Sequence, residues 1–259
     1  MKPKVLILHA TGTNRDHDAA LAVELAGGFP EIVHLNQLRR AERRWSDYQM
    51  LILPGGFSYA DALGAGRLLA LDLTIYFAEE ALSFVNSGKP VLGICNGFQA
   101  LVKSGILPDP DDLEPTQKLT LTHNASGNFE CRWISLLPVS QSCVWTAGLQ
   151  ELIFCPVAHG EGRLMLKSPA VLDGLRDHDQ VALVYVRPDG SLADDAYPDN
   201  PNGSTAGIAG ICNRRGNVLG LMPHPENHVL PWQFPHKSIP PYGSGLVIFK
   251  NGVSFASQF

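Results

Sequence analysis

Long hydrophobic runs and positive charge are both scarce in this 259-residue sequence. No apolar run approaches the roughly 20 residues that a membrane-spanning helix needs, and the first, Val5–Leu8, is too short and wrongly flanked for a signal peptide. Lysine and arginine number 20 against 25 aspartate and glutamate residues, which gives a net charge of −5 at pH 7. We therefore expect a cytoplasmic protein that binds neither membrane nor nucleic acid, and whose ligand is a small molecule or another protein.

Cysteine and histidine spacing excludes further classes of protein. The five cysteines are odd in number and contain no C-x-x-C pair, so neither a disulfide framework nor a zinc ribbon fits. The histidines form no cluster with metal-ligand spacing, and we predict that the chain holds no catalytic metal. No G-x-x-x-x-G-K-[ST] motif and no G-x-G-x-x-G motif that opens a helix occurs, so the chain shows no recognisable phosphate cradle for ATP.

What the chain does contain is the composition of an ordinary folded protein. Hydrophobic residues make up 45 % and charged residues 17 % of the sequence. A chain of this size buries roughly three quarters of its unfolded surface, which is ample for a core. Neither an internal repeat nor a low-complexity tract is present, so we predict one domain over residues 1–259.

The first half of the chain alternates short aliphatic runs with helical stretches. Continuous aliphatic runs suit strands that are covered on both faces, and the alternation predicts repeated βαβ units. We therefore expect an α/β fold with a doubly wound, mostly parallel central sheet, in which ligands bind at the carboxyl ends of the strands. The expected strands are Val5–Leu8, Ile32–Leu35, Met50–Leu53 and Pro90–Ile94, and the expected helices are Asp18–Leu25, Ala62–Asn86 and Gly97–Leu107.

The second half predicts a small antiparallel element followed by a return to the main sheet. Short runs broken by Gly, Pro, Asn and Asp indicate antiparallel strands at Arg132–Leu136, Leu152–Val157, Arg163–Leu166 and Val181–Val186. The Asp-, Pro-, Asn- and Gly-rich segment Pro188–Ser204 predicts a surface loop near the site. Val218–Leu221 is expected to rejoin the sheet. The proline-rich stretch 228–242 argues against regular structure, and a last helix is expected at Gly245–Asn251.

The strongest local motif is the run Gly93-Ile94-Cys95-Asn96-Gly97, in which a strand passes directly into a helix. This is the nucleophile-elbow pattern with cysteine in the serine position. Small neighbours allow the tight turn, and the helix N-terminus favours a thiolate over a thiol. An isolated cysteine is most often a small buried hydrophobe. The two glycines reverse that interpretation here, and we predict that Cys95 is a nucleophile.

A thiolate nucleophile requires an imidazole base, and His224 lies in Pro223-His224-Pro225-Glu226 just after a predicted strand. The two prolines are expected to hold this segment extended, which would place the side chains of His224 and Glu226 on one side. Glu226 would then orient the imidazole. The backbone amide of Asn96 and that of Gly56, from the Gly55-Gly56 pair after another predicted strand, are the expected oxyanion-hole donors.

These residues resemble the class I (triad) glutamine amidotransferases, a flavodoxin-like α/β family, and within them the glutaminase subunits of phosphoribosylformylglycinamidine synthase. The resemblance runs along nearly the whole chain. The elbow and the H-P-E run are shared by all triad amidotransferases. The match is narrowed by the runs F-S-Y (57–59), C-N-G-F-Q (95–99), C-R-W (131–133), H-G-E-G-R (159–163) and N-P-N-G-S (200–204).

The resemblance implies a catalytic triad of Cys95, His224 and Glu226, an oxyanion hole of Gly56 and Asn96, and glutamine contacts from Gln99, His159 and Gly160. It implies that glutamine is hydrolysed to glutamate and ammonia. Ammonia would pass to a large synthetase subunit, which would hold the ATP and magnesium, in a complex that also contains a small bridging subunit. This chain itself would need no cofactor.

Two alternatives and two departures remain at this point. A cysteine hydrolase of the same fold, such as a γ-glutamyl hydrolase or a peptidase, or a non-catalytic scaffold protein, would share the elbow.

The chain departs from the family where Ala60 stands in place of a common glycine, and where Asn227 stands in place of a common arginine. Neither position belongs to the triad.

Overall fold

A nine-stranded mixed sheet forms the centre of the structure. The computed structural model describes residues 2–110, 117–235 and 244–259, and within them the strand order is β2-β1-β3-β4-β11-β10-β9-β6-β7. Five neighbouring strands pair in parallel. They are β1 (Lys4–His9), β2 (Phe29–His34), β3 (Met50–Leu53), β4 (Val91–Ile94) and β11 (Val218–Leu221). The predicted α/β fold with a parallel, helix-flanked sheet is confirmed.

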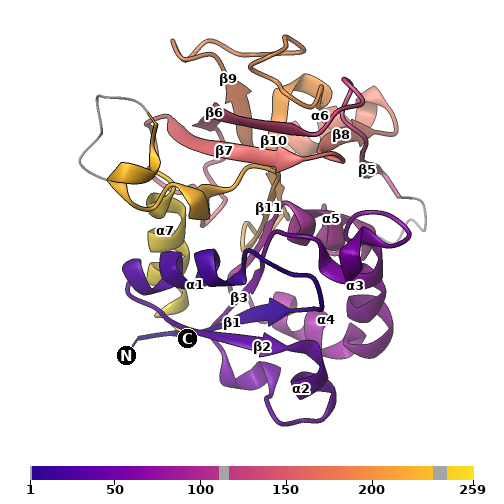
Figure 1. Ribbon diagram of the computed structural model, residues 1–259, viewed down its shortest axis with the longest axis vertical. Coiled ribbons are helices and arrows are strands. Elements are labelled where there is room, and N and C mark those ends of the chain that lie inside the picture. The colour runs from indigo at the N-terminus through magenta and orange to yellow at the C-terminus, as the bar shows by residue number, and fades with distance from the viewer. Residues whose placement is uncertain (1, 111–116, 236–243) are drawn as a thin grey trace.

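Helices cover both faces of the parallel half, as Figure 1 shows. On one side lie α1 (Asp16–Leu25) and α7 (Leu246–Ala256), and on the other lie α3 (Arg67–Leu71), α4 (Ala78–Asn86) and α5 (Asn96–Lys103). Every residue of β3, β4 and β11 is buried, which explains why these strands consist of aliphatic residues and glycine. Because β3, β4 and β11 run parallel, their carboxyl ends meet at one edge of the sheet.

The other half of the sheet is antiparallel. β10 (Ile208–Cys212), β9 (Val181–Val186), β6 (Glu130–Pro138) and β7 (Ile153–His159) continue the sheet beyond β11. A separate antiparallel pair is formed by β5 (Leu119–Thr122) and β8 (Arg163–Leu166), and α6 (Pro169–Asp177) follows β8. The predicted antiparallel strands are all present; β8 and β9 have the predicted bounds, and those of β6 and β7 differ slightly.

The expected helix Ala62–Asn86 is wrong as a single element. The chain forms a short turn, η2 (Ser58–Asp61), then α3, a π-helical turn η3 (Asp72–Tyr76), and α4. Positive φ angles at Leu63, Gly64 and Gly66 delay the start of α3, because the backbone there lies in the left-handed region. Apolar spacing alone does not reveal such a backbone.

Other element boundaries shift for local reasons. Leu35 belongs to α2 (Leu35–Arg39) rather than to a strand, because the His34 ring accepts a hydrogen bond from the Asn36 amide and caps the helix. Helix α5 ends before Gly105, whose φ of 79° terminates it. The last helix extends to Ala256, further than expected. The remaining turns are η1 (Trp45–Asp47), η4 (Thr205–Gly207), η5 (Pro225–Asn227) and η6 (Pro231–Gln233).

Two predicted irregular segments have different outcomes. The loop 188–204 is not wholly at the surface, because Asn200, Asn202 and Ser204 near its end are buried. The proline-rich segment 228–242 contains the short helix η6, and its residues 236–242 lie outside the described residues. Among the described residues, no helix is long and apolar enough to cross a membrane.

Candidate active site

Cys95 occupies a strained turn between β4 and α5. Its φ of 49° and ψ of −101° place a non-glycine residue in a rarely occupied backbone region. Its amide donates to the Leu221 carbonyl over 2.8 Å, which ties the turn to the end of β11. The elbow predicted from the motif is therefore present, with the thiol at the junction where helix α5 begins.

The glycines on either side of Cys95 are required by close packing. A Cβ added to Gly97 would lie 1.9 Å from the carbonyl oxygen of Leu53, at the end of β3. A Cβ added to Gly93 would lie 2.5 Å from Leu101 Cδ1 and 2.9 Å from the Gly97 backbone. Only glycine lets α5 approach the two strands this closely.

His224 and Glu226 form a buried pair. Nδ1 of His224 lies 2.6 Å from Oε1 of Glu226, and both side chains are almost wholly inaccessible to solvent. Burial by itself lowers the pKa of His224, but the Glu226 carboxylate and the neighbouring Cys95 thiol outweigh it and raise the pKa to about 10. The expected orientation of the imidazole by Glu226 is thus seen in the structure.

The reason given for this pairing from the sequence is wrong. The segment after His224 is not extended, because Pro225–Asn227 forms the short helix η5. Proline at the first position of a helix costs no hydrogen bond, so Pro225 begins this turn instead of preventing it. The turn brings the Glu226 carboxylate back to the imidazole, and the His224 amide donates to the Pro156 carbonyl over 2.8 Å.

Gly55 brings the imidazole and the nucleophile together. A Cβ added to Gly55 would lie 2.6 Å from Cε1 of His224 and 3.5 Å from Cβ of Cys95, so both side chains border this glycine. Within the described residues, Nε2 of His224 has no hydrogen-bond partner. Glu226 therefore contacts Nδ1, and Nε2 remains available for another hydrogen bond.

Gly56 adopts a φ of 120° and crosses close to the segment after β1. A Cβ there would lie 2.5 Å from Oδ1 of Asn14, so this position also requires glycine. Gly56 lines a pocket together with Cys95. Asn96 is the first residue of α5, and its amide is one of the first-turn N–H groups that have no acceptor in the helix.

The pocket above Cys95 has a volume of about 160 Å³. Its walls combine backbone with a few polar and aromatic side chains: Gly56, Phe57, Asp61, Ala65, Cys95, Gln99, Phe129, Ala158, His159, Gly160 and Glu161. Gln99 donates from Nε2 to the Glu161 carbonyl over 2.8 Å, which joins α5 to the opposite wall. All the predicted glutamine contacts, Gln99, His159 and Gly160, thus lie at this pocket.

Two carboxylates at the pocket were not identified from the sequence. Asp61 accepts from Nδ2 of Asn96 over 2.9 Å, and burial together with the charge of Glu161 raises its pKa. Glu161 lies 3.9 Å from Nζ of Lys103. Glu161 stands inside the H-G-E-G-R run and Asp61 lies two residues after the F-S-Y run, but neither carboxylate was assigned a role from the sequence.

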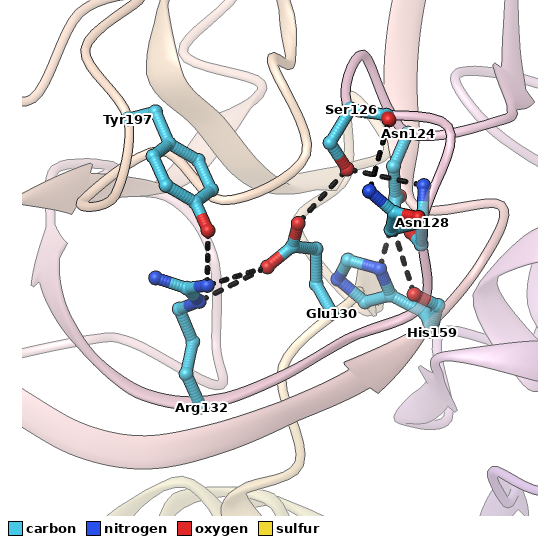
Figure 2. Close-up of polar contacts among 7 residues, drawn as sticks. All are labelled: Asn124, Ser126, Asn128, Glu130, Arg132, His159 and Tyr197. Carbon is cyan, nitrogen blue, oxygen red and sulfur yellow. Dashed lines mark hydrogen bonds and ion pairs between the residues drawn. The ribbon is translucent and has the colours of Figure 1, made fainter.

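The ring of His159 is held between two asparagines. Nδ1 of the ring lies 3.1 Å from Oδ1 of Asn124, and Figure 2 shows Asn124 also contacting the His159 carbonyl. Nε2 lies 3.5 Å from Nδ2 of Asn202. Neither asparagine was assigned a role from the sequence, although Asn202 belongs to the N-P-N-G-S run.

Comparison with known proteins agrees with this geometry. The CobB/CobQ-like glutamine amidotransferase domain family matches residues 2–256. A phosphoribosylformylglycinamidine synthase subunit PurQ from Treponema denticola is 57 % identical over 242 residues, which are 89 % of this chain and 90 % of the relative. The PurQ subunit of Dehalococcoides mccartyi is 45 % identical and covers 99 % of both chains. The chain belongs to the PurQ family of glutamine amidotransferases.

A solved structure supports the same assignment. PurLQS from Thermotoga maritima superimposes with a TM-score of 0.73 at 32 % identity, over 98 % of this chain and 99 % of that chain. PurQ proteins are the glutaminase subunits of phosphoribosylformylglycinamidine synthase, so the function implied by the sequence resemblance is confirmed.

The two departures from the PurQ pattern have local structural settings. Ala60 has a φ of 55°, a left-handed conformation that glycine adopts at lower cost. Asn227 donates from Nδ2 to Asp18 in α1 over 3.2 Å. Neither side chain lines the pocket. Among the described residues, no group of three or more His, Cys, Asp or Glu is placed to hold a metal ion, and the absence of a catalytic metal stays a prediction.

Proposed function

We propose that Cys95 is the nucleophile with which this chain releases ammonia from glutamine, and that His224 and Glu226 complete its triad. The observation that carries this proposal is the strained Cys95 elbow, which opens into a pocket and borders the same glycine as a carboxylate-oriented imidazole. A buried structural cysteine would need neither the backbone strain nor the two close-packed glycines.

In the first step, the sulfur of Cys95 attacks the side-chain amide carbon of glutamine, and a tetrahedral intermediate forms. His224 donates a proton to the departing ammonia, and a γ-glutamyl thioester remains on Cys95. His224 then accepts a proton from water as the water attacks the thioester, and glutamate leaves. The raised pKa of His224 keeps the imidazole protonated at neutral pH, and the protonated form is the one that can donate a proton to the departing ammonia.

The oxyanion of each intermediate is assigned to the backbone amides of Asn96 and Gly56. The Asn96 amide lies at the N-terminus of α5, where the helix contributes partial positive charge. The side chain of Asn96 is occupied elsewhere, because Oδ1 accepts from Ser58 and Nδ2 donates to Asp61. These side-chain contacts fix Asn96, so its backbone N–H is held at the N-terminus of α5, next to Cys95.

Glutamine carries an α-ammonium and an α-carboxylate besides its reacting amide. Asp61 and Glu161 line the pocket and supply negative charge that suits the α-ammonium group. Gln99, Gly160 and the backbone of His159 are assigned to the remaining walls. Because Glu161 lies near Lys103, Asp61 is the carboxylate whose charge is less compensated.

Ammonia is then passed to a separate synthetase subunit, which we propose holds the ATP and magnesium and is joined by a small bridging subunit. Phe57 and Phe129 line the pocket yet remain 45 % and 54 % exposed, and Leu63 in the neighbouring loop is 72 % exposed. Exposed apolar side chains around a catalytic pocket suit docking of a partner that covers it. A covered pocket would keep ammonia from escaping to water.

The test is a reconstituted complex with the synthetase subunits, assayed with glutamine and separately with ammonium chloride. Cys95→Ser should abolish the glutamine-dependent synthesis of formylglycinamidine ribonucleotide and leave the ammonia-dependent synthesis intact. Cys131→Ser is the matched control, because Cys131 is an exposed free thiol, and it should retain both activities. Loss of both activities in Cys95→Ser would contradict the division of labour.

Labelling of the complex and turnover by the isolated chain provide a second test against the alternatives. A glutamine-analogue electrophile such as 6-diazo-5-oxo-norleucine should label Cys95 in the complex, and peptide mapping will locate the adduct. Absence of labelling would favour a non-catalytic scaffold. Turnover of γ-glutamyl peptides or folate conjugates by the isolated chain would favour a hydrolase instead.

A further inference from the structure

His159 is a buried titratable side chain that borders the active site and that the proposed mechanism does not use. It ends β7, is only 3 % exposed, and lies between two buried asparagines from distant segments, Asn124 and Asn202. A histidine so placed is either a proton carrier or a structural group. The hydrogen bonds of the two asparagines decide between these roles.

The amide of Asn124 has only one possible orientation. Its Oδ1 accepts from the backbone N–H of Gly162 over 2.9 Å, and its Nδ2 donates to the carbonyls of Asn128 and His159 over 2.9 and 2.8 Å. Backbone N–H groups only donate and carbonyls only accept. Oδ1 therefore faces Nδ1 of His159 as an acceptor, so this ring nitrogen must carry the hydrogen (Figure 2).

Asn202 is oriented in the same way from the other side of the ring. Its Oδ1 accepts from the backbone N–H of Ser204 over 3.0 Å, and its Nδ2 donates to the Gly162 carbonyl over 2.9 Å and to the Tyr185 hydroxyl over 3.1 Å. Nδ2, which can only donate, also lies 3.5 Å from Nε2 of His159. A hydrogen on Nε2 would meet a nitrogen that offers no acceptor, so the geometry favours an unprotonated Nε2.

We propose that His159 is a positioning residue, held by Asn124 and Asn202 as the neutral Nδ1–H tautomer, which fixes the pocket wall 158–161 for glutamine. This inference rests on the proposed function, because it concerns the wall that binds the substrate. It assigns to the second asparagine of the N-P-N-G-S run a role in controlling the protonation of a residue 43 positions away.

The wall and the ring are mechanically connected. The backbone N–H of Asn124 donates to the Gly160 carbonyl over 2.9 Å, and a Cβ on Gly162 would lie 2.4 Å from the His159 ring. Between these two glycines, the Glu161 carbonyl accepts from Gln99 at the pocket. A ring that turned or gained a second hydrogen would displace this turn, and with it the wall of the pocket.

The loop that carries Asn124 is itself anchored from outside. Figure 2 shows the chain of contacts from Ser126 through Glu130 to Arg132 and Tyr197. Glu130 accepts from the Ser126 hydroxyl over 2.9 Å and pairs with Arg132 over 2.8 Å, and the guanidinium of Arg132 stacks on the Tyr197 ring. These contacts hold the loop so that Oδ1 of Asn124 stays opposite Nδ1 of His159.

The charged surroundings agree with a neutral ring. Burial, followed by the charge of His224, lowers the pKa of His159 to about 3. The titratable groups on the elements around it are His224 with its partner Glu226, Cys95 of the elbow, Tyr185 of β9, Cys155 of β7, Glu130 paired with Arg132 on β6, and Glu161 near Lys103. Among the hydrogen bonds and ion pairs of the described residues, neither Glu130 nor Glu161 is joined to the His159 ring.

The first experiment is ¹⁵N NMR of the full chain with labelled histidine, titrated from about pH 5 to about pH 9 across the ordinary histidine range. The resonances of His159, assigned by comparison with His159→Gln, should show the neutral Nδ1–H tautomer throughout. Protonation of His159 within this range, or the Nε2–H tautomer, would overturn the proposal. This measurement needs no variant of the asparagines to fold.

The second experiment compares Asn202→Asp with Asn200→Asp in the reconstituted complex. Asn200 is the matched control, because it is buried in the same turn and donates from Nδ2 to two carbonyls, of Asp194 and Ser204, but does not contact His159. A carboxylate at position 202 replaces the donor opposite Nε2 with an acceptor, so His159 should become protonated within the titrated range.

For Asn202→Asp we expect the KM for glutamine to rise about fivefold to tenfold, as for loss of one hydrogen bond, with kcat changed less than about twofold. Asn200→Asp should leave His159 neutral and the KM within about twofold of the wild type. Equal KM changes in both variants, or a protonated His159 with an unchanged KM, would overturn the positioning role. Failure of the proposed function would show separately, as absence of 6-diazo-5-oxo-norleucine labelling at Cys95 in the wild type.

Discussion

Replacing Gly97 with alanine tests the close approach on which the catalytic turn depends. The new Cβ would lie 1.9 Å from the Leu53 carbonyl oxygen. A carbon–oxygen contact normally measures about 3.3–3.6 Å, so α5 and the end of β3 must separate by roughly 1.4 Å or more. Overpacking of this kind costs about 1–3 kcal/mol of the free energy of unfolding. Leu53 immediately precedes the segment that carries Gly56, so the displacement reaches the proposed oxyanion hole.

Activity should fall more than stability suggests. A misplacement of about 1 Å in a catalytic site reduces the rate by about a hundredfold, and both proposed oxyanion donors border this contact. Glutaminase activity in the reconstituted complex and urea unfolding of the isolated chain measure the two effects. We expect a lower urea midpoint together with a loss of kcat/KM of about a hundredfold.

The same substitution at Gly174 is the matched control. Gly174 lies within α6, and a Cβ there meets no atom within 4 Å. Alanine at such a helical position stabilises by about 0.5–1 kcal/mol, so the sign of the effect reverses. The reasoning fails if Gly97→Ala retains the wild-type midpoint and activity, or if Gly174→Ala destabilises the chain as much.

Three further predictions concern the triad and the loop after the oxyanion glycine. In the wild type, the raised pKa of His224 stabilises the fold below about pH 6.5, and this stabilisation is lost as the pH rises toward 10. Glu226→Gln removes the main cause of the raised pKa, so urea unfolding at these two pH values should show a smaller fall in stability than for the wild type; an equal fall would contradict the ion pair. Asp61→Asn should raise the KM for glutamine about tenfold, because an interaction with the α-ammonium charge is lost while an amide oxygen still accepts from Asn96; an unchanged KM in steady-state kinetics would remove Asp61 from substrate recognition. Ala60→Gly should stabilise the chain by about 1 kcal/mol, because glycine adopts the observed φ of 55° without steric cost, and a lower urea midpoint would refute this.

Local patterns were sufficient to predict the elbow and the parallel strands. The run from Gly93 to Gly97 places a cysteine between a strand and a helix, and this geometry depends almost entirely on neighbouring residues. Aliphatic runs such as Met50–Leu53 likewise predicted buried strands because burial on both faces leaves no alternation to preserve. The PurQ motifs added the assignment of roles within this frame.

Local patterns failed where the backbone has unusual conformations. The positive φ angles at Leu63, Gly64 and Gly66 and the π-helical turn η3 interrupt what apolar spacing indicated as one long helix. Pro225 begins a short helix where an extended segment was expected, although the contact between His224 and Glu226 is the same in outcome. In both cases the conformation follows a local backbone preference, positive φ angles in one and proline at the first helical position in the other, that apolar spacing and proline content alone do not reveal.

By itself, the sequence determined the turn that holds the proposed nucleophile and the order of the elements, because these depend on residues next to one another in the chain. Only the tertiary structure decided which groups surround them. Asn124 and Asn202 are far from His159 in the sequence, and the sheet brings them to opposite nitrogens of one ring. Protonation and positioning of a buried side chain depend on such through-space partners, which no local pattern records.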